Sequence, residues 1–577
     1  MNLLFVVIPS AIFLTVAYLT YGRILARLLR LDPKVVTPAV ELRDDVDYVP
    51  IEPKFLLGQH FSAIAAAGPI VGPILAGVMF GWAPALAWIL IGSVFIGGVH
   101  DLTALAASIR HKARSIAEVV REHMSHRSYI LFMTFVWLAL VYIIVAFTDV
   151  TAASFVGIQQ LENGQQITGG GIATSSLLYL ILPMVMGVLL RYTKLSIGWA
   201  TIIFLPLVAV SIGVGQYIPL DLTKLLALES DNDARKVWDA ILLVYCVVAS
   251  VIPMWLLLQP RGHLGGYFLY AVLFAGAAGL VFGGKTIEYP ALIPEAINGP
   301  NGGLFPILFI TIACGACSGF HSIIASGTTS KQLKLETDAK PVGYGSMLLE
   351  AMVAVVSLCC VMMLPRSSPL FSGSPSPNHL YALGIGSFTS VLGIPAAFGV
   401  SFGLMAFTTF VYDTLDVCTR LGRYILQELT GFQGNVARFV STIVTAAVPL
   451  VFLIAQSNEG PPAWRVFWNL FGASNQLLAA LTLLGVTVWL WRTTRSQSLL
   501  MITGLPCIWM YAMSMWALFI SLKPLLKAFE PGGSLTSDPV PWVALVLALL
   551  GVLMLIDAIL VLGKPRVSPP TAVAPVT

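Results

Sequence analysis

The chain has 577 residues, of which 57% are hydrophobic and 10% are charged, and its mean hydropathy is +0.86. No segment is long and polar enough to form a soluble domain, and the net charge of +4 includes no basic patch of the kind that binds nucleic acid. The composition therefore predicts an all-α polytopic membrane protein whose partner along most of its surface is the lipid bilayer.

Apolar runs of about 20 residues, the length that a membrane-spanning helix needs, fill most of the chain. Cytoplasmic loops are rich in lysine and arginine, and with the N-terminus outside 24 of the 32 such residues fall on the cytoplasmic side. An odd number of helices then leaves the C-terminus inside. We predict fifteen transmembrane helices, at residues 2–22, 57–80, 84–108, 128–150, 172–190, 195–216, 237–258, 264–283, 303–330, 342–364, 386–418, 438–455, 466–490, 498–522 and 540–562.

Two Gly-Pro pairs, Gly68-Pro69 and Gly72-Pro73, interrupt the second predicted helix. Proline removes a backbone donor and clashes with the preceding turn, while glycine tolerates the kink that results. In a bilayer, freed backbone groups are tolerated only where they are buried in protein or line a cavity. Interrupted helices therefore indicate the substrate or ion site of a transporter. A kink that serves packing alone is the alternative, since both residues are common in membrane helices.

A second breaker, Pro253, falls in the predicted helix at 237–258, five helices later and in the opposite direction. Two interrupted helices with this relation are what an inverted five-plus-five repeat predicts. The sequence similarity between the two halves is too weak to prove such a repeat.

Ionisable side chains inside the predicted spans are costly to bury, so they are candidates for function. Desolvation can bring the titration of a carboxylate or imidazole close to neutral pH, as proton coupling requires. A hydrogen bond that only joins two helices is the alternative for each of them. In chain order the candidates are His60, His100, Asp101, His321, Glu350, Asp413 and Asp416.

Hydroxyl side chains recur in the ninth predicted helix, at Ser318, Ser322, Ser326 and Ser330, a spacing of four that places them on one helix face. Small residues at this spacing allow close helix packing, whereas hydroxyl oxygens are also the hard ligands that Na⁺ prefers. Both interpretations stay open for the first two serines. Coordination is favoured for Ser326, Thr328 and Thr329. In the same helix Cys314 and Cys317 lack a second pair that would complete a zinc site, so packing is the better interpretation.

Two arginines end predicted helices at the cytoplasmic edge, Arg261 after 253–260 and Arg420 after 414–419. Each can anchor its helix at the lipid head groups, which is the usual role at this position. Each can instead pair with Asp101 or Asp416 to form an inner gate. Farther along, the amides in 471–476 are expected to form helix–helix hydrogen bonds.

These motifs together resemble the carbon-starvation protein A (CstA) family. The resemblance implies a bacterial inner-membrane secondary transporter with a LeuT-like core, which imports peptides or pyruvate. In that scheme 57–80 and 237–258 are the first and sixth core helices. The span 303–330 is then the eighth, which offers hydroxyls to a sodium site in Na⁺-coupled relatives. Gly262 stands where family members often carry aspartate, and the segment after His321 also differs from the family pattern. These differences leave the identity of the substrate and of the coupling ion open. The matching stretches are 58–61, 66–73, 253–261, 314–321, 414–420 and 471–479.

The residues and the resemblance together predict import of a small carboxylate, pyruvate or a short peptide, by alternating access. The protein is expected to need no cofactor and not to be an enzyme; H⁺ or Na⁺ is the expected coupling ion, and the oligomeric state is left open. We expect an N-terminal helix and basic loop at 1–56, a LeuT-like 5+5 core at 57–418, accessory helices at 419–563 and a disordered cytoplasmic tail at 564–577.

The candidate residues fall into three groups. The substrate carboxylate is expected at the N–H groups and positive dipole end of a broken half-helix. The substrate group is Ala67, Gly68, Pro69, Gly72, Pro73, Pro253, Trp255 and His321. The proton-coupling or gating group is His60, His100, Asp101, Glu350, Asp416, Arg261 and Arg420. The alternative Na⁺ site is formed by Ala66, Ser326, Thr328 and Thr329.

Two other classes of protein remain as alternatives. A channel is expected to carry a filter motif, and the sequence has none. A membrane-embedded enzyme could use His100 with Asp101, or His321 with Ser322, but no motif sets such a nucleophile beside an oxyanion site.

Overall fold

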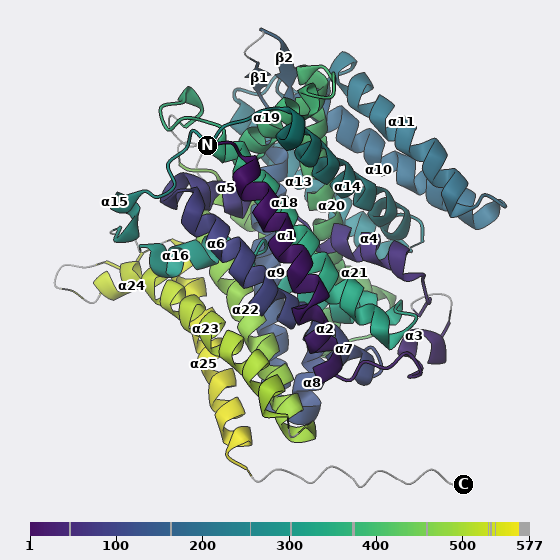
Figure 1. The fold of residues 1–577 in the computed structure, drawn as a ribbon, viewed down its shortest axis with the longest axis vertical. Coiled ribbons are helices and arrows are strands. Elements are labelled where there is room, and N and C mark those ends of the chain that lie inside the picture. Colours follow the sequence, from purple (N-terminus) through teal and green to yellow (C-terminus); the bar gives the residue numbers. More distant parts are fainter. Residues whose placement is uncertain are drawn as a thin grey trace.

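The computed structural model describes residues 1–44, 48–161, 164–253, 255–299, 303–371, 376–456, 460–494, 496–528, 530, 534–536 and 538–564. The tail predicted at 564–577 lies, except for Lys564, outside the described residues. The first half of the fold (Figure 1) contains α1 (Leu4–Leu19), α2 (Tyr21–Leu28), α3 (Pro38–Glu41), α4 (Pro53–Ile64), α5 (Gly68–Phe80), α6 (Trp82–Gly92), η1 (Ser93–Gly97), α7 (Gly98–Arg110), α8 (Ile116–His123), α9 (His126–Ala152), β1 (Ile158–Gln160), β2 (Gln166–Thr168), α10 (Gly169–Tyr192), α11 (Ile197–Tyr217), α12 (Leu222–Leu225) and α13 (Asp231–Val251).

The second half is also helical, and the antiparallel hairpin of β1 and β2 stands between α9 and α10. The remaining elements are α14 (Leu258–Phe282), α15 (Pro294–Ile297), α16 (Leu304–Thr311), α17 (Phe320–Gly327), η2 (Thr329–Lys331), η3 (Glu336–Asp338), η4 (Lys340–Gly345), α18 (Ser346–Met362), η5 (Pro369–Phe371), α19 (Pro377–Ser390), α20 (Ala396–Thr430), α21 (Asn435–Ala455), α22 (Ala463–Thr493), α23 (Gln497–Ser521), α24 (Lys523–Lys527) and α25 (Pro539–Leu562).

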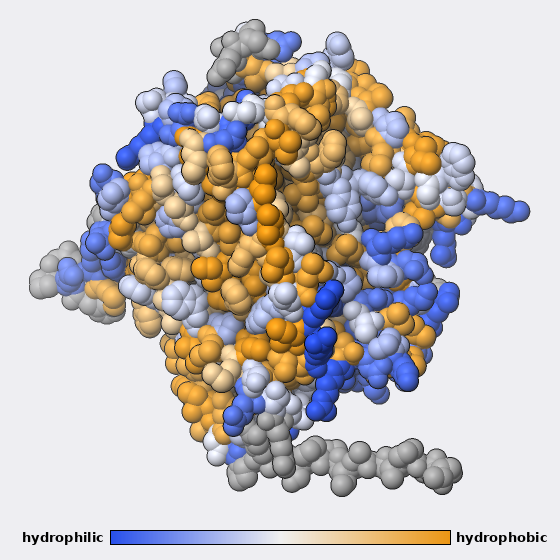
Figure 2. Space-filling view, in the orientation of Figure 1, coloured by the Kyte–Doolittle hydropathy of each residue, from blue (hydrophilic) through white to orange (hydrophobic). Residues whose placement is uncertain are grey.

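The surface of the molecule is apolar where a bilayer would surround it. Within the described residues twelve helices are long and apolar enough to cross a membrane, or 13 if the bent pair α4 and α5 is one span. Large side chains such as Phe5, Ile202 and Leu549 are exposed on peripheral helices. Hydrophobic residues cover most of the face in Figure 2, and hydrophilic ones gather at its upper left and lower right. The all-α, multi-pass architecture is confirmed, whereas the count of fifteen spans is not reached.

Pro253 does not interrupt a helix, so the prediction of a broken span at 237–258 was wrong. Helix α13 ends at Val251 and α14 begins at Leu258, and Pro253 lies exposed in the linker between them. Proline disfavours helical geometry in the residue before it, which explains why α13 ends where it does. The neighbouring Met254 lies outside the described residues.

Two other predicted spans are divided. The span at 303–330 contains two short helices, α16 and α17, separated by residues 312–319. The span at 386–418 contains the end of α19, a turn at 391–395 and the start of α20. Gly393 adopts a left-handed φ of 78° in that turn, and Pro395 stands directly before α20. Helix α20 then continues to Thr430, past the core boundary predicted at 418.

The two interrupted helices cross at their breaks. Helices α4 and α5 are bent by 48° across residues 65–67, and α5 packs against α16. A Cβ atom at Gly68 would collide with the Cβ and Sγ atoms of Cys314. One at Gly72 would lie 2.6 Å from the carbonyl oxygen of Thr311. The Gly-Pro motif therefore lets two backbones approach at the centre of the fold.

We expect Gly68→Ala to destabilise the protein by about 1–3 kcal/mol, the usual result of forcing an extra methyl group into a packed interior. The added methyl group meets the side chain of Cys314, whose Cα atom lies 3.7 Å away. Adding Cys314→Gly should restore most of the loss, because it removes both colliding atoms. Thermal unfolding in detergent measures both effects.

Gly58→Ala is the matched control, because a Cβ there meets only the Tyr270 hydroxyl at 3.6 Å, an ordinary contact. If Gly68→Ala unfolds at the same temperature as this control, the crossing is looser than described.

Candidate functional site

A chain of four ionisable side chains lies in the interior, completely shielded from solvent. Asp101 on α7 accepts hydrogen bonds from His100 Nδ1 at 2.7 Å and from His321 Nδ1 at 2.8 Å. The other ring nitrogen of His321, on α17, lies 3.2 Å from Glu350 Oε2 on α18. All four side chains are 0% exposed. The structure thus joins three helices through residues that the sequence picked out one by one.

Local backbone irregularities bring these helices together. A π-helical turn precedes each carboxylate, η1 before α7 and η4 before α18. Such turns are rare and recur at functional sites. The two helices approach closely, because a Cβ at Gly343 in η4 would lie 3.2 Å from the Cα atom of Leu102. The chain of ionisable groups therefore depends on backbone geometry that a regular helix would not supply.

The geometry of this chain defines a position for one proton. Both ring nitrogens of His321 face carboxylate oxygens, which only accept when ionised. A neutral imidazole that donates to Asp101 from Nδ1 turns a lone pair from Nε2 toward Glu350. The lone pair and the ionised carboxylate repel each other, and a proton on either His321 Nε2 or Glu350 Oε2 removes this repulsion. Neither oxygen of Glu350 accepts a hydrogen bond from the other described residues, so the imidazole of His321 is the group that faces this carboxylate.

The break at 312–319 is closed by amide side chains from α22. Gln476 Nε2 donates to the carbonyl oxygens of Ala313 and Cys317, each at 3.0 Å. Asn475 Oδ1 accepts a hydrogen bond of 3.0 Å from the backbone N–H of Phe320, which is the first residue of α17. The expectation of helix–helix hydrogen bonds from these amides is confirmed. Because these carbonyl groups are occupied, this part of the break supports the helix crossing.

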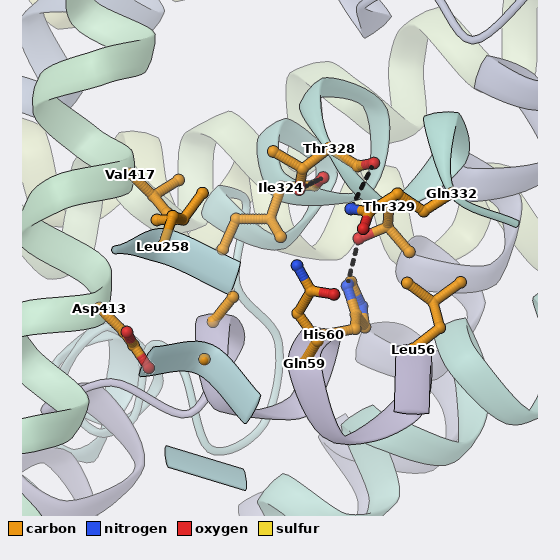
Figure 3. Close-up of a pocket in the computed structure, with 12 residues that line it drawn as sticks. Leu56, Gln59, His60, Leu258, Ile324, Thr328, Thr329, Gln332, Asp413 and Val417 are labelled. Carbon is orange, nitrogen blue, oxygen red and sulfur yellow. Dashed lines mark hydrogen bonds between the residues drawn. The ribbon is translucent and has the colours of Figure 1, made fainter. Parts of the chain in front are cut away.

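A small cavity lies beside the ionisable chain, between α4, α14, α17, η2 and α20 (Figure 3). Its volume of about 30 Å³ for water-sized occupants gives room for roughly two water molecules. His60 points into it and its Nδ1 atom lies 2.8 Å from Thr329 Oγ1. Asp413 and Thr328 line the same space. This cavity contains gating and sodium candidates of the sequence, but none of the substrate candidates.

Arg261 is buried between two carboxylates on the far side of that cavity. Its Nε atom donates to Asp413 Oδ1 at 2.5 Å, and Nη1 pairs with Asp416. Asp413 also accepts from Ser62 on α4 at 2.5 Å, and Asp416 accepts from Tyr245 on α13 at 2.8 Å. Of the two roles that the sequence left open for Arg261, the structure has the pairing with Asp416.

Arg420 takes neither of these roles, because its side chain is buried inside the protein and does not reach the lipid head groups. Its Nη2 atom donates to the carbonyl oxygens of Ala249 and Ile252, at 2.7 and 2.9 Å, where α13 ends. Cationic side chains satisfy the last carbonyls of a helix in this way. Arg420 therefore fixes the end of α13, and among the described residues it is not ion-paired with Asp101 or Asp416.

The predicted substrate residues do not form one site. Ala67, Gly68, Pro69, Gly72 and Pro73 are buried at the helix crossing. Trp255 lies apart from them in the linker after α13, with the guanidinium of Arg191 5.6 Å from its ring centre. His321 belongs to the ionisable chain instead. The sequence grouped these residues on the assumption that Pro253 breaks a helix opposite 57–80.

The sodium candidates use their hydroxyl protons within the protein. Ser326 donates to the carbonyl of Ser322 at 2.7 Å, and Thr328 donates to that of Ile324 at 3.0 Å. Such bonds leave the oxygen lone pairs free to face a cation. Ala66 lies between α4 and α5, and its N–H donates to the Ile64 carbonyl at 2.8 Å.

Sequence reasoning missed a buried cluster between α9 and α13. Asp149 Oδ1 lies 3.1 Å from Arg235 Nε, and Asp149 Oδ2 accepts from the backbone N–H of Trp464 at 2.7 Å. Asp239, one helical turn beyond Arg235, is also buried. Asp149 lies inside the predicted span at 128–150, so the rule that selected the other intramembrane acids would have found it.

Comparison with known proteins gives matches along most of the chain. The family described as Carbon starvation protein CstA matches residues 2–378 and 371–517. A peptide transporter CstA from Helicobacter pylori is 30% identical, covering 91% of this chain and 82% of that protein. The peptide transporter CstA of Bacillus subtilis is 32% identical, covering 85% of each chain. The pyruvate/proton symporter BtsT of Escherichia coli is 31% identical, covering 91% and 83%.

Among solved structures, a manganese transporter from Eremococcus coleocola is similar with a TM-score of 0.46 and 15% identity. The match covers 90% of this chain and 99% of that one.

Proposed function

Because the chain belongs to the carbon starvation protein CstA family, we propose that it is a proton-coupled secondary transporter that imports a small carboxylate-bearing nutrient across the bacterial inner membrane. Relatives are named as peptide transporters and as a pyruvate/proton symporter. Pyruvate and short peptides share a carboxylate, so that group is the common feature a binding site would recognise.

The chain Asp101–His321–Glu350 is the observation that carries the proposal. Two carboxylates flank one imidazole without exposure to solvent. The proton between His321 Nε2 and Glu350 Oε2, 3.2 Å apart, offsets part of the negative charge of the two carboxylates. Its loss leaves an excess negative charge in the interior, which is costly and favours a change of conformation. This is the behaviour that couples a proton to alternating access.

The substrate carboxylate is placed beside the N-terminal end of α5, where a more open conformation must make room for it, because Cys314 packs against Gly68 here. This helix begins at Gly68 inside the protein and no side chain caps it. The first N–H groups and the positive dipole end of a helix attract anions. The cavity of about 30 Å³ beside α4 holds no more than roughly two waters, so the substrate path must widen when the helices move. An inverted five-plus-five core remains a prediction for how that movement is organised.

Sodium coupling through Ser326, Thr328 and Thr329 is the alternative drive. Thr328 and Thr329 line the cavity beside His60, which supports it. The two drives differ in the gradient that they require, so one experiment separates them.

Uptake of labelled pyruvate and of a labelled dipeptide into proteoliposomes tests the proposal. With an inward proton gradient of one pH unit, a one-to-one electroneutral symporter should accumulate substrate up to about tenfold. A protonophore should abolish the accumulation, and empty liposomes serve as the control. Accumulation driven only by a sodium gradient would mean that sodium at the hydroxyl groups, and not the proton of the ionisable chain, drives transport. If neither gradient drives uptake of either compound, the proposed substrates are wrong.

A further inference from the structure

A second group of titratable side chains lies outside the spans, at the end of α7. His111 follows the last residue of that helix, and Glu122 and His123 end α8. The Nε2 atoms of the two histidines face each other at 2.9 Å. One ligand atom from each of the three residues lies within 4.8 Å of the others. The positive-inside pattern predicts that this group is on the cytoplasmic side.

A strained turn brings the two histidines together. Lys112 and Ala113 follow His111 with φ values of 59° and 54°, in the left-handed region that residues with a Cβ rarely adopt. Ser108 Oγ donates to the Arg114 carbonyl at 2.7 Å and closes the turn. Helix α8 then folds back beside the end of α22, in the lower part of Figure 1. Strain of this kind persists where the surroundings impose it, and it clusters at functional sites.

The hydrogen bonds of His111 show which of its ring nitrogens carries a lone pair toward His123. Its Nδ1 atom lies 2.6 Å from the carbonyl oxygen of Ala107. A carbonyl can only accept, so Nδ1 carries the ring proton and Nε2 is the basic nitrogen in the neutral imidazole. Histidines that bind metals are oriented by this same contact from the other ring nitrogen. Trp489 packs edge-on against the ring at 5.5 Å and further limits its rotation.

We propose that His111, Glu122 and His123 bind one divalent transition-metal ion. Two imidazoles with one carboxylate are a donor set that suits iron, cobalt, nickel and other first-row ions. With metal–nitrogen bonds of about 2.1 Å, nitrogens 2.9 Å apart subtend roughly 90° at the metal. A tetrahedral ion would need a separation of about 3.4 Å. The spacing is compatible with a six-coordinate ion such as Ni²⁺, which is therefore a suitable probe of the site.

The surroundings indicate what fills the remaining coordination positions. The three residues line a pocket of about 780 Å³ together with Arg30, Arg110, Lys112 and Arg114. The Arg110 guanidinium is occupied, because Nε donates to Glu336 Oε1 at 2.8 Å. The other cations line the same pocket, and an anionic co-ligand such as phosphate would offset their repulsion of the metal.

Titration of the full-length protein with Ni²⁺ alone, followed by calorimetry, tests the site. The protein is purified through a tag without histidine, so that the tag binds no metal. We expect one ion per chain, and Glu122→Gln should weaken binding at least tenfold. Glu122 is exposed, so the substitution leaves the fold intact. His123→Ala should weaken binding further, at least a hundredfold.

Two matched controls keep the result specific. Glu118→Gln removes another carboxylate of α8, and His126→Ala removes an exposed histidine that stacks on Tyr129 instead. Both should bind Ni²⁺ as the native chain does. A native protein without saturable Ni²⁺ binding overturns the proposal and leaves an ordinary hydrogen bond between His111 and His123. Equal affinity in Glu122→Gln and the native chain overturns it too, even if His123→Ala fails to fold.

Discussion

Replacing Asp101 by asparagine is expected to abolish proton-driven accumulation of substrate, reducing uphill uptake at least a hundredfold. The native carboxylate accepts hydrogen bonds from His100 and from His321, at 2.7 and 2.8 Å. Asparagine keeps the shape but removes the negative charge that stabilises a proton on His321. Its NH₂ group also faces one of the two donors, which should cost about 1–3 kcal/mol of stability. The measurement is uptake into proteoliposomes under an inward proton gradient.

Downhill exchange of labelled for unlabelled substrate should survive in Asp101→Asn, because the variant loses coupling and keeps the substrate path. Asp557→Asn is the matched control. That aspartate lies on the accessory helix α25 and is also buried. It accepts a hydrogen bond from Ser128 Oγ at 3.0 Å and lies outside the ionisable chain. Undiminished accumulation by Asp101→Asn would remove the ionisable chain from the mechanism.

Replacing Arg261 by glutamine should have the largest effect on stability. The side chain is 0% exposed and pairs with both Asp413 and Asp416. Removing one partner of a buried ion pair costs about 3–5 kcal/mol, because an uncompensated charge stays behind, and here two carboxylates lose their cation. We expect little folded protein in the membrane, measured as monodisperse yield and unfolding temperature.

Adding Asp413→Asn and Asp416→Asn to Arg261→Gln should restore the fold, since no uncompensated charge remains. Arg420→Gln is the comparison variant. It loses hydrogen bonds to two backbone carbonyls and should cost only about 1–3 kcal/mol. An Arg261→Gln protein that unfolds at the native temperature would mean that water reaches these carboxylates.

The sequence predicted the helices well where hydrophobicity alone defines them, and poorly where a break depends on tertiary contacts. The Gly-Pro motif at 68–73 predicts a break in its span, but the break precedes it: α5 begins at Gly68, with Pro69 in its first turn, and continues through Gly72-Pro73. Residues 312–319 contain no proline, and their break is maintained by Gln476 from a helix far along the chain. Conversely, proline chemistry predicts an interruption within a helix at Pro253, but this residue lies after the end of α13.

The ionisable residues were identified because burying charge is costly at any position in a bilayer. The pairs that these residues form could not be predicted, because a single sequence carries no information on which helices face each other. Asp101 and His321 meet across 220 positions, and Arg261 reaches Asp413 across 152. For Arg261 and Arg420 the sequence allowed the same two roles. The packing of α20 against α13 and α14 pairs Arg261 with Asp416 and gives Arg420 a role that the sequence did not predict, at the end of α13.

The contact between Gly68 and Cys314 leaves no room for one more methyl group, so the two backbones cannot slide past each other at that point. We expect movement to occur in the segments on either side, because each of the two helices is interrupted beside the contact. The crossing would then act as a fulcrum. Displacement would be smallest there and would grow toward Phe80 at the end of α5 and Gly327 at the end of α17. A small rotation at the centre would thereby be converted into a larger opening near the membrane surfaces.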